Sequence, residues 1–177
     1  MNSNFSQNHF ALFGVTPAFQ IDLNQLEKTY RDLQSQVHPD RFANQGETER
    51  RVSMQWATRV NEAYQTLKKP LNRADYLLQL NGVEALQENN TAMPPEFLVS
   101  QMTWREAIMD AQSAHDMNGL EQLERELKDA TQILHQQIGQ LLDVDKNYQA
   151  AAESLRKLKF MEKLMVEIHD AYEALET

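Results

Sequence analysis

Residues 38–40 read His38-Pro39-Asp40 and stand between two stretches of helical periodicity. Before the triplet, apolar side chains recur every three or four residues, which is the spacing of one helix face, at Leu23, Leu26, Tyr30, Leu33 and Val37. After the loop 41–46, a second stretch of this kind runs to Pro70. Because Pro39 has no amide donor and disfavours helical backbone at His38, we expect the triplet on an exposed loop between two helices.

Three interpretations fit the triplet alone. It is a helix stop whose Asp40 caps the next segment, an exposed loop that acts on a partner, or a catalytic His–Asp pair. No metal-ligand cluster lies near it in the sequence, and the chain has no cysteine. This composition disfavours an enzyme, and it excludes disulfides and cysteine-ligated zinc or iron–sulfur clusters on this chain.

The composition is that of a soluble globular protein. The 177 residues have room for one ordinary domain or two small ones, and 41% of them are hydrophobic and 24% charged. No apolar run is long enough to span a bilayer, and residues 1–10 lack Lys and Arg, so we expect neither a secretory signal nor a transit peptide. The reducing cytoplasm is the simplest predicted location for a chain without cysteine.

Charge divides the chain into two dissimilar halves. Residues 1–80 hold 9 Lys and Arg against 8 Asp and Glu, whereas residues 81–177 hold 8 against 18. This asymmetry predicts two modules that face different partners. The acidic second half argues against nucleic-acid binding, because phosphates require a basic surface.

The second half is predicted to be a helical bundle. Residues 83–95, rich in Asn and Pro, are interpreted as a linker. A helix is expected from about Glu96 to Met117, with a stop at Asn118-Gly119. Two further stretches carry regular apolar stripes, which predicts an antiparallel three-helix bundle over residues 96–177. A coiled coil that pairs with another chain is the alternative. The predicted fold class is all-α, and Gly139 inside the second bundle helix has no explanation from the sequence.

The helix that begins near Glu96 carries apolar residues on two faces. At 100° per residue, Phe97, Trp104 and Ile108 fall on one side and are predicted to face the core. A second set falls on roughly the opposite side and ends in carboxylates: Leu98, Val99, Met102, Glu106 and Asp110. An outward apolar patch bordered by acids indicates a protein-binding surface, unless the linker or the first domain covers it.

Four segments in register resemble the J-domain, the module by which co-chaperones stimulate the ATPase of seventy-kilodalton heat-shock chaperones. They are residues 26–33, the triplet at 38–40, residues 60–67 and residues 69–76. The resemblance implies a helical hairpin with the triplet in its loop, over residues 1–82. It also implies a set of chaperone-binding residues, formed by His38, Pro39 and Asp40 together with the basic residues Lys28, Arg31 and Arg41.

The whole chain resembles the HscB family, co-chaperones of bacterial iron–sulfur cluster assembly. Further matching segments are Phe10-Ala11-Leu12-Phe13-Gly14, residues 72–78 and Arg156-Lys157-Leu158-Lys159-Phe160. The resemblance implies two partners, an HscA-type chaperone and the scaffold protein IscU, which hold ATP and the cluster, so that no cofactor or metal is expected on this chain. By position, the implied scaffold-binding residues are Leu98, Val99, Met102, Glu106, Asp110 and Phe160.

Three positions depart from the family's usual pattern. Val37 stands where Tyr is usual, Ser35 where a basic residue is common, and Thr103 where an acidic one is usual. Because the helix before the triplet then carries fewer basic residues, we expect a weaker, salt-sensitive attraction to the chaperone. Two other functions stay open, a general J-protein that serves other chaperones and a helical adaptor in which the triplet is incidental.

Overall fold

The computed structural model describes residues 7–37, 46–86 and 93–176, and within these ranges it contains helices and connecting segments but no strand. The predicted all-α fold is confirmed. The chain divides into two compact units, Met1–Leu77 and Leu78–Thr177. This division falls ahead of residue 82, and the domain boundaries expected at residues 82 and 95 stay a prediction.

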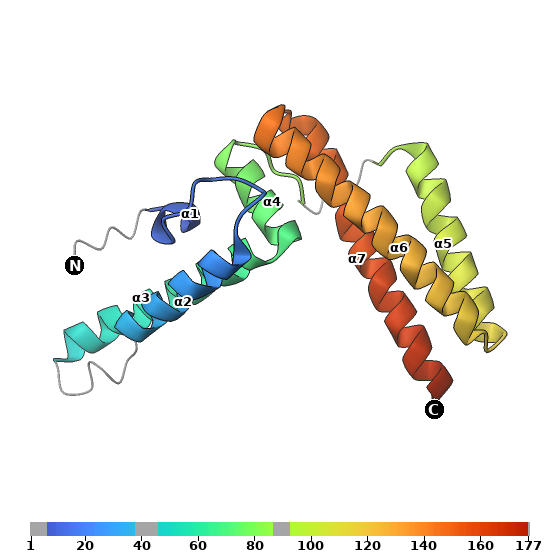
Figure 1. The fold of residues 1–177 in the computed structure, drawn as a ribbon, viewed down its shortest axis with the longest axis horizontal. Coiled ribbons are helices and arrows are strands. Elements are labelled where there is room, and N and C mark those ends of the chain that lie inside the picture. The colour runs from blue at the N-terminus through green and yellow to red at the C-terminus, as the bar shows by residue number, and fades with distance from the viewer. Residues whose placement is uncertain (1–6, 38–45, 87–92, 177) are drawn as a thin grey trace. The chain divides into compact units, whose positions relative to one another are not determined.

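The first unit is built on a helical hairpin. Its described elements are α1 (His9–Leu12), α2 (Leu23–Val37), α3 (Glu47–Lys68) and most of α4 (Pro70–Leu80). Helices α2 and α3 lie side by side and run in opposite directions (Figure 1). Asp22 caps α2, because its Oδ1 accepts hydrogen bonds from the backbone N–H groups of Asn24 and Gln25 at 2.9 and 3.1 Å.

Aromatic side chains hold this hairpin together. The Tyr30 ring on α2 stacks on the Tyr64 ring on α3, with 3.9 Å between centroids and 8° between planes. The Phe13 ring also packs on the Tyr64 ring, with 6.5 Å between centroids. The buried apolar core around them consists of Phe10, Phe13, Phe19, Leu26, Val60, Ala63, Leu67 and Ala74.

A buried arginine joins α4 to this core. Arg73 is only 5% exposed, and its guanidinium lies over the Phe19 ring at 5.1 Å. Its Nε donates to the Phe19 carbonyl oxygen at 2.7 Å, and its Nη1 donates to the Leu67 carbonyl oxygen at 2.5 Å. A buried cation is stable only when its donors have acceptors of this kind, so Arg73 fixes the end of α3 and the segment before α2 at once.

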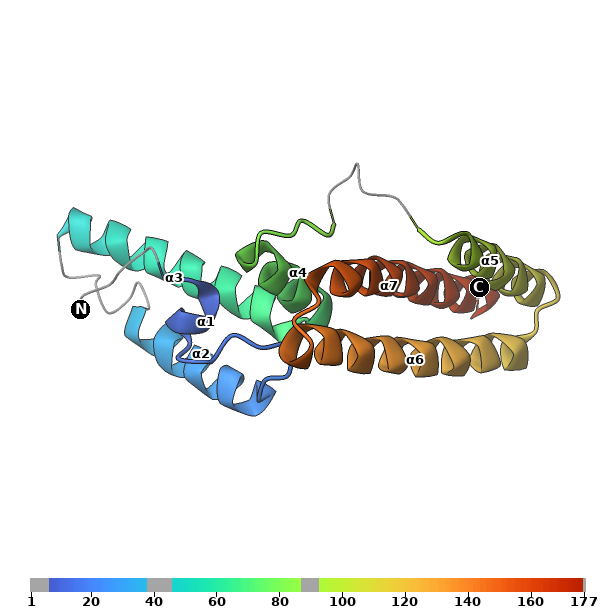
Figure 2. The same cartoon turned by 90° about the horizontal axis from the view of Figure 1, so that it is seen from above.

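The second unit contains an antiparallel bundle of α5 (Pro95–Ser113), α6 (Met117–Gly139) and α7 (Tyr148–Glu176), as predicted. Consecutive helices reverse direction, and all three lie along one another (Figures 1 and 2). The buried core between them draws on every helix, with Ile108, Leu120, Leu127, Leu134, Ile138, Leu155, Leu158, Leu164 and Ile168.

The connection between α5 and α6 differs from the prediction. Helix α5 ends at Ser113, and Asn118-Gly119 lies in the first turn of α6 instead of ending α5. The expected stop was wrong because His115 adopts the left-handed conformation, with φ of 54°, and Asp116 then caps α6 by accepting a hydrogen bond from the Gly119 N–H at 3.0 Å. The chain thus turns without using its glycine.

Gly139 lies at the start of the connection between α6 and α7. Helix α6 ends at this buried glycine, and the backbone continues as a π-helical segment, η2 (Gln140–Val144). The Asn147 N–H donates to the Leu141 carbonyl oxygen at 2.9 Å, which closes the turn before α7. Gly139 therefore marks the change from α to π geometry, a type of irregularity that sequence periodicity does not reveal.

The two tryptophans of the chain are divided between the units. Trp56 lies on α3 in the first unit, and Trp104 lies on α5 in the second. Both side chains are half-buried.

Candidate functional site

The residues on either side of the segment 38–45 are described, although His38, Pro39, Asp40 and Arg41 themselves lie outside the described residues. Helix α2 ends at Val37. The buried Ser53 on α3 donates its hydroxyl hydrogen to the Val37 carbonyl oxygen at 2.7 Å. This bond ties the last residue of α2 to α3 and fixes the point from which the chain enters the triplet.

The two basic residues expected on α2 are exposed. Lys28 and Arg31 are three residues apart, so they share a helix face. Arg31 is paired with Glu27 at 2.6 Å, with the two side chains 74% and 47% exposed. The pair partly neutralises Arg31, and Lys28 therefore supplies more of the positive field of this face than its neighbour does.

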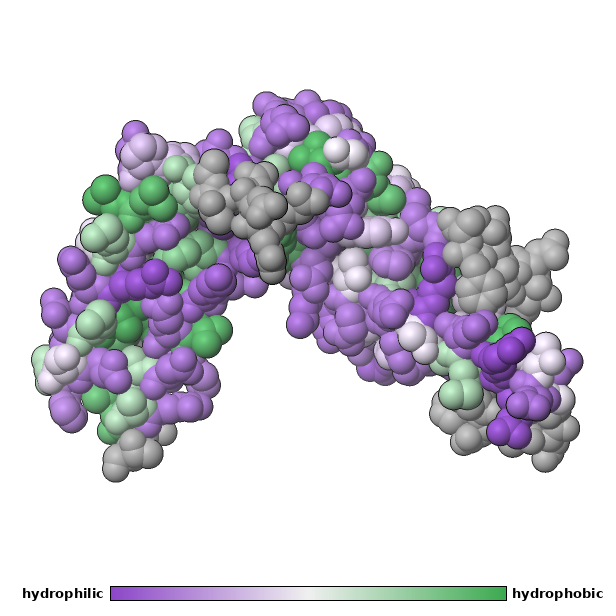
Figure 3. Space-filling view, turned by 180° about the vertical axis from the view of Figure 1, so that it is seen from behind, coloured by the Kyte–Doolittle hydropathy of each residue, from purple (hydrophilic) through white to green (hydrophobic). Residues whose placement is uncertain are grey.

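Three apolar side chains of α5 point away from the bundle core, and we call them the apolar strip: Leu98, Val99 and Met102. They are 47%, 64% and 63% exposed, respectively, whereas Ile108 on the opposite face is 4% exposed. Figure 3 shows hydrophobic side chains over the N-terminal part of α5. The two faces deduced from the 100° spacing are thus present.

The same face of α5 continues past the strip. Glu106 and Asp110 are exposed, as expected for its acidic border. Met109 is 64% exposed and lies two helical turns beyond Met102, so it extends the apolar face into this acidic part. Met109 was not predicted, although its seven-residue spacing from Met102 places it on the same helix face.

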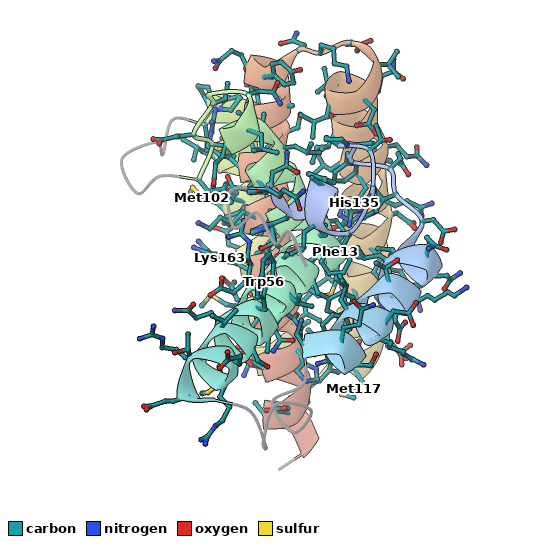
Figure 4. The ribbon with its side chains drawn as sticks, turned by 90° about the vertical axis from the view of Figure 1, so that its left-hand side faces the viewer. Phe13, Trp56, Met102, Met117, His135 and Lys163 are labelled. Atoms are coloured by element: carbon teal, nitrogen blue, oxygen red, sulfur yellow. The ribbon has the colours of Figure 1, made fainter. Side chains whose placement is uncertain are left out.

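Phe160 reaches the same region from α7. Its half-buried ring makes an edge-to-face contact with the Phe97 ring, with 5.8 Å between centroids and 81° between planes. The Arg105 guanidinium lies over the Phe160 ring at 5.0 Å. In Figure 4, Met102 of α5 and Lys163 of α7 project toward the same side of the bundle. Residues from both helices therefore contribute to one face.

An ion pair between the helices accompanies this aromatic contact. Nε of Arg105 donates to both carboxylate oxygens of Glu167 at 3.2 and 3.1 Å, and Nη2 donates to Oε1 at 3.0 Å. The hydrogen bond with Glu167 raises the pKa of the Arg105 guanidinium above its usual value. Arg105 was not predicted as a functional residue.

A shallow cavity of about 350 Å³ lies beside the strip, between α5 and α6. Val99 is at its edge, and Trp104 and Leu123 contribute to its lining. Thr103, the position where an acidic residue is usual, lines the same cavity and donates its hydroxyl to the Val99 carbonyl oxygen at 3.2 Å. This hydroxyl is thus bonded within its own helix.

The first unit holds a histidine with a shifted pKa. Burial, and then the nearby charge of Arg59, lower the pKa of His9, while Glu62 acts in the opposite direction. The His9 ring stacks on the Tyr76 ring with 4.4 Å between centroids, and the backbone N–H of His9 donates to the Tyr76 hydroxyl oxygen at 3.0 Å. His9 thus connects α1 to α4.

Both units match families of known proteins. Residues 8–76 match the family model described as "DnaJ domain", and residues 93–169 match "HSCB C-terminal oligomerisation domain". A "Co-chaperone protein HscB homolog" of Azoarcus sp. is 50% identical over 176 residues, which cover 99% of each chain. The chain belongs to the HscB co-chaperone family. A second HscB homologue, from Paraburkholderia phymatum, is 47% identical over 98% of this chain and 99% of the relative.

Solved HscB structures have the same fold as this HscB-family chain. "Chaperone HscB from Vibrio cholerae" matches with a TM-score of 0.86 and 35% identity, covering 96% of this chain and 99% of that one. The human co-chaperone HscB matches with a TM-score of 0.88 and 28% identity, covering 94% of this chain and 83% of that one. The first unit is accordingly a J-domain, and the relatives are named as co-chaperones, not as enzymes.

The described ranges lack both a membrane-spanning helix and a metal-binding cluster. In residues 7–37, 46–86 and 93–176 there is no helix both long and apolar enough to cross a membrane. Across the same part of this HscB-family chain, no three His, Asp or Glu side chains gather in a way that could hold a metal ion.

Proposed function

We propose that this co-chaperone stimulates the ATPase of an HscA-type heat-shock chaperone and delivers the scaffold protein IscU to it during iron–sulfur cluster assembly in the cytoplasm. The J-domain match and the HscB relatives support the chaperone half of this proposal. The exposed apolar strip of α5 is the observation that carries the scaffold half. ATP and the cluster are held by the partners, and the chain contributes contacts without a catalytic group of its own.

The chaperone contact is assigned to the triplet loop. Asp40 supplies a carboxylate for a cation on the chaperone, Pro39 restricts the loop backbone, and His38 offers hydrogen bonds. Lys28 and Arg31, with Arg41 beyond the triplet, attract an acidic surface and raise the rate of encounter. The hydrogen bond from Ser53 to Val37 supports this assignment, because it anchors the chain where the loop begins.

The scaffold contact is assigned to the face shared by α5 and α7. Leu98, Val99 and Met102 provide apolar area that docking can remove from water, and Phe160 adds an aromatic ring beside them. Glu106 and Asp110 form an acidic rim, which orients a partner more than it contributes affinity. Because the same chain holds both partners, each encounters the other at a raised effective concentration.

The test measures steady-state ATP hydrolysis by a purified HscA-type chaperone with this chain, with the IscU scaffold, and with both. We expect this chain to raise the rate, and the scaffold to raise it further only when the chain is present. Asp40→Asn should abolish the stimulation while helicity and scaffold binding stay unchanged, because the change is nearly isosteric. Asp32→Asn, which removes the same charge from an exposed site on α2, is the matched control.

Each result has a defined meaning. An unaltered ATPase response to Asp40→Asn would contradict the J-domain mechanism, and a loss of helicity would indicate that Asp40 is a structural cap. Stimulation without any scaffold binding would favour a general J-protein. No stimulation and no binding would leave a helical adaptor.

A further inference from the structure

Arg105 lies between the two parts of the scaffold-binding face. It follows Leu98 by seven residues and Met102 by three, so it shares their ridge on α5. Its guanidinium, however, reaches α7, where it contacts both Glu167 and the Phe160 ring. Arg105 thus lies on the ridge of the apolar strip and contacts the Phe160 ring of α7.

Phe160 needs such a contact to keep a fixed orientation. A phenyl ring has no polar atom by which hydrogen bonds could orient it, and this ring is only half-buried. Two neighbours restrict it, the Phe97 ring at 5.8 Å in edge-to-face geometry and the Arg105 guanidinium at 5.0 Å. The exposed part of the ring is available to a partner.

Glu167 in turn fixes the guanidinium. It accepts three N–H···O contacts between 3.0 and 3.2 Å, and a planar guanidinium held by both carboxylate oxygens has little freedom to rotate. The Arg105 and Glu167 side chains are 47% and 37% exposed, and ion pairs this exposed add little to folding stability. The pair therefore contributes little to folding stability, and what it does determine is the position of the guanidinium over the Phe160 ring.

We propose that Arg105 is a positioning residue of the scaffold-binding surface: held by Glu167, it fixes the Phe160 ring in register with Leu98 and Met102. This inference rests on the proposed scaffold-binding function and adds a device that organises the surface before the partner arrives. Preorganisation of this kind raises affinity because less freedom is lost on binding.

A double-mutant cycle tests the inference with the full-length chain and the IscU scaffold, with Kd measured by calorimetry. Arg105→Met keeps the length of the side chain and removes the guanidinium, and we expect scaffold binding about fivefold weaker, in line with the usual strength of a cation–π contact. In a Phe160→Ala background, the same change should have no further effect. Arg125→Met is the matched control, because Arg125 is an exposed arginine paired with Glu121 on α6, and it should leave Kd unchanged.

Arg105→Lys separates orientation from charge. Lysine keeps the positive charge but lacks the planar fork that holds Glu167 and covers the ring together. We therefore expect Arg105→Lys to bind as weakly as Arg105→Met. Full recovery of affinity with lysine would show that only the charge matters, and it would overturn the inference.

A measurement without the scaffold separates this inference from the proposed function. In NMR spectra of the free protein, the Phe160 ring signals should shift in Arg105→Met and stay in place in Arg125→Met. Unmoved ring signals would overturn the inference even if the scaffold binds. Equal weakening by Arg105→Met in the presence and absence of the Phe160 ring would also overturn it. Failure of the unaltered chain to bind the scaffold would overturn the proposed function and, with it, the role assigned to Arg105.

Discussion

Truncation of the apolar strip should weaken scaffold binding by an amount that can be derived from its exposure. Leu98 and Met102 are 47% and 63% exposed in the free protein. Full burial of such a side chain is worth about 1.5–3 kcal/mol, so covering the exposed parts contributes about 0.7–1.4 kcal/mol from Leu98 and about 0.9–1.9 kcal/mol from Met102. Together this corresponds to a change in Kd of roughly 15- to 250-fold.

The combined variant Leu98→Ala and Met102→Ala should weaken scaffold binding about tenfold or more, so the loss can fall just below that range, because alanine keeps part of each contact. The melting temperature should change little, since these side chains leave no buried cavity when truncated. Calorimetric titration with the scaffold and thermal unfolding followed by circular dichroism provide the two measurements. Ile133→Ala combined with Val166→Ala is the matched control, because these residues are 65% and 59% exposed on α6 and α7.

One result would refute this reasoning. A large fall in melting temperature, with unchanged affinity per folded molecule, would show that the strip is internal packing in solution. The scaffold site on α5 would then be wrong, although the J-domain assignment would survive.

Two further predictions concern the J-domain. Lys28→Glu combined with Arg31→Glu should lower the association rate with the chaperone, and the difference should shrink as salt rises because exposed charges act over about 10 Å at 0.1 M ionic strength. Stopped-flow measurements at low and high salt give these rates. Rates that do not change with salt would show that neither side chain attracts the chaperone. Since Arg31 is already paired with Glu27, Lys28→Glu alone should account for most of the effect. Burial lowers the pKa of His9, so the folded state favours the neutral ring. The contribution of His9 to the free energy of unfolding is therefore fully present above the ordinary pKa of about 6.5, and it is lost as the pH falls toward the lowered pKa. His9→Gln should therefore flatten the dependence of the urea midpoint on pH between about pH 7 and 5, and an unchanged slope would contradict it.

The elements that follow a regular period were predictable from the sequence. The apolar spacing in residues 23–37 predicted α2, and the two stripes at 100° per residue predicted both faces of α5. Helix α4 ends just before Asn81-Gly82, where Gly82 adopts a φ of 75°, which is a common way for a helix to end. These features depend on neighbours within a few residues, so local sequence determines them.

Features that depend on the register between helices were not predictable. Arg105 and Glu167 are 62 residues apart, and their contact exists only because α5 and α7 pack at one particular offset. The turn at His115 and the π-helical segment after Gly139 likewise break the periods on which the prediction relied. Ser53 donates a hydrogen bond to the carbonyl oxygen of Val37, the last residue of α2, but in the sequence it is an ordinary serine in a helical stretch.

The division of the tryptophans between the two units gives each unit its own fluorophore. Trp104→Phe would leave Trp56 as the only indole, so its emission would report the J-domain alone, and Trp56→Phe would do the same for the bundle. Unfolding curves from the two single-tryptophan proteins coincide only if the chain unfolds as one cooperative body. Because Trp104 lines the cavity beside Val99, the bundle's fluorophore would also sense a partner that settles on the strip, which allows docking and unfolding to be followed by one optical signal.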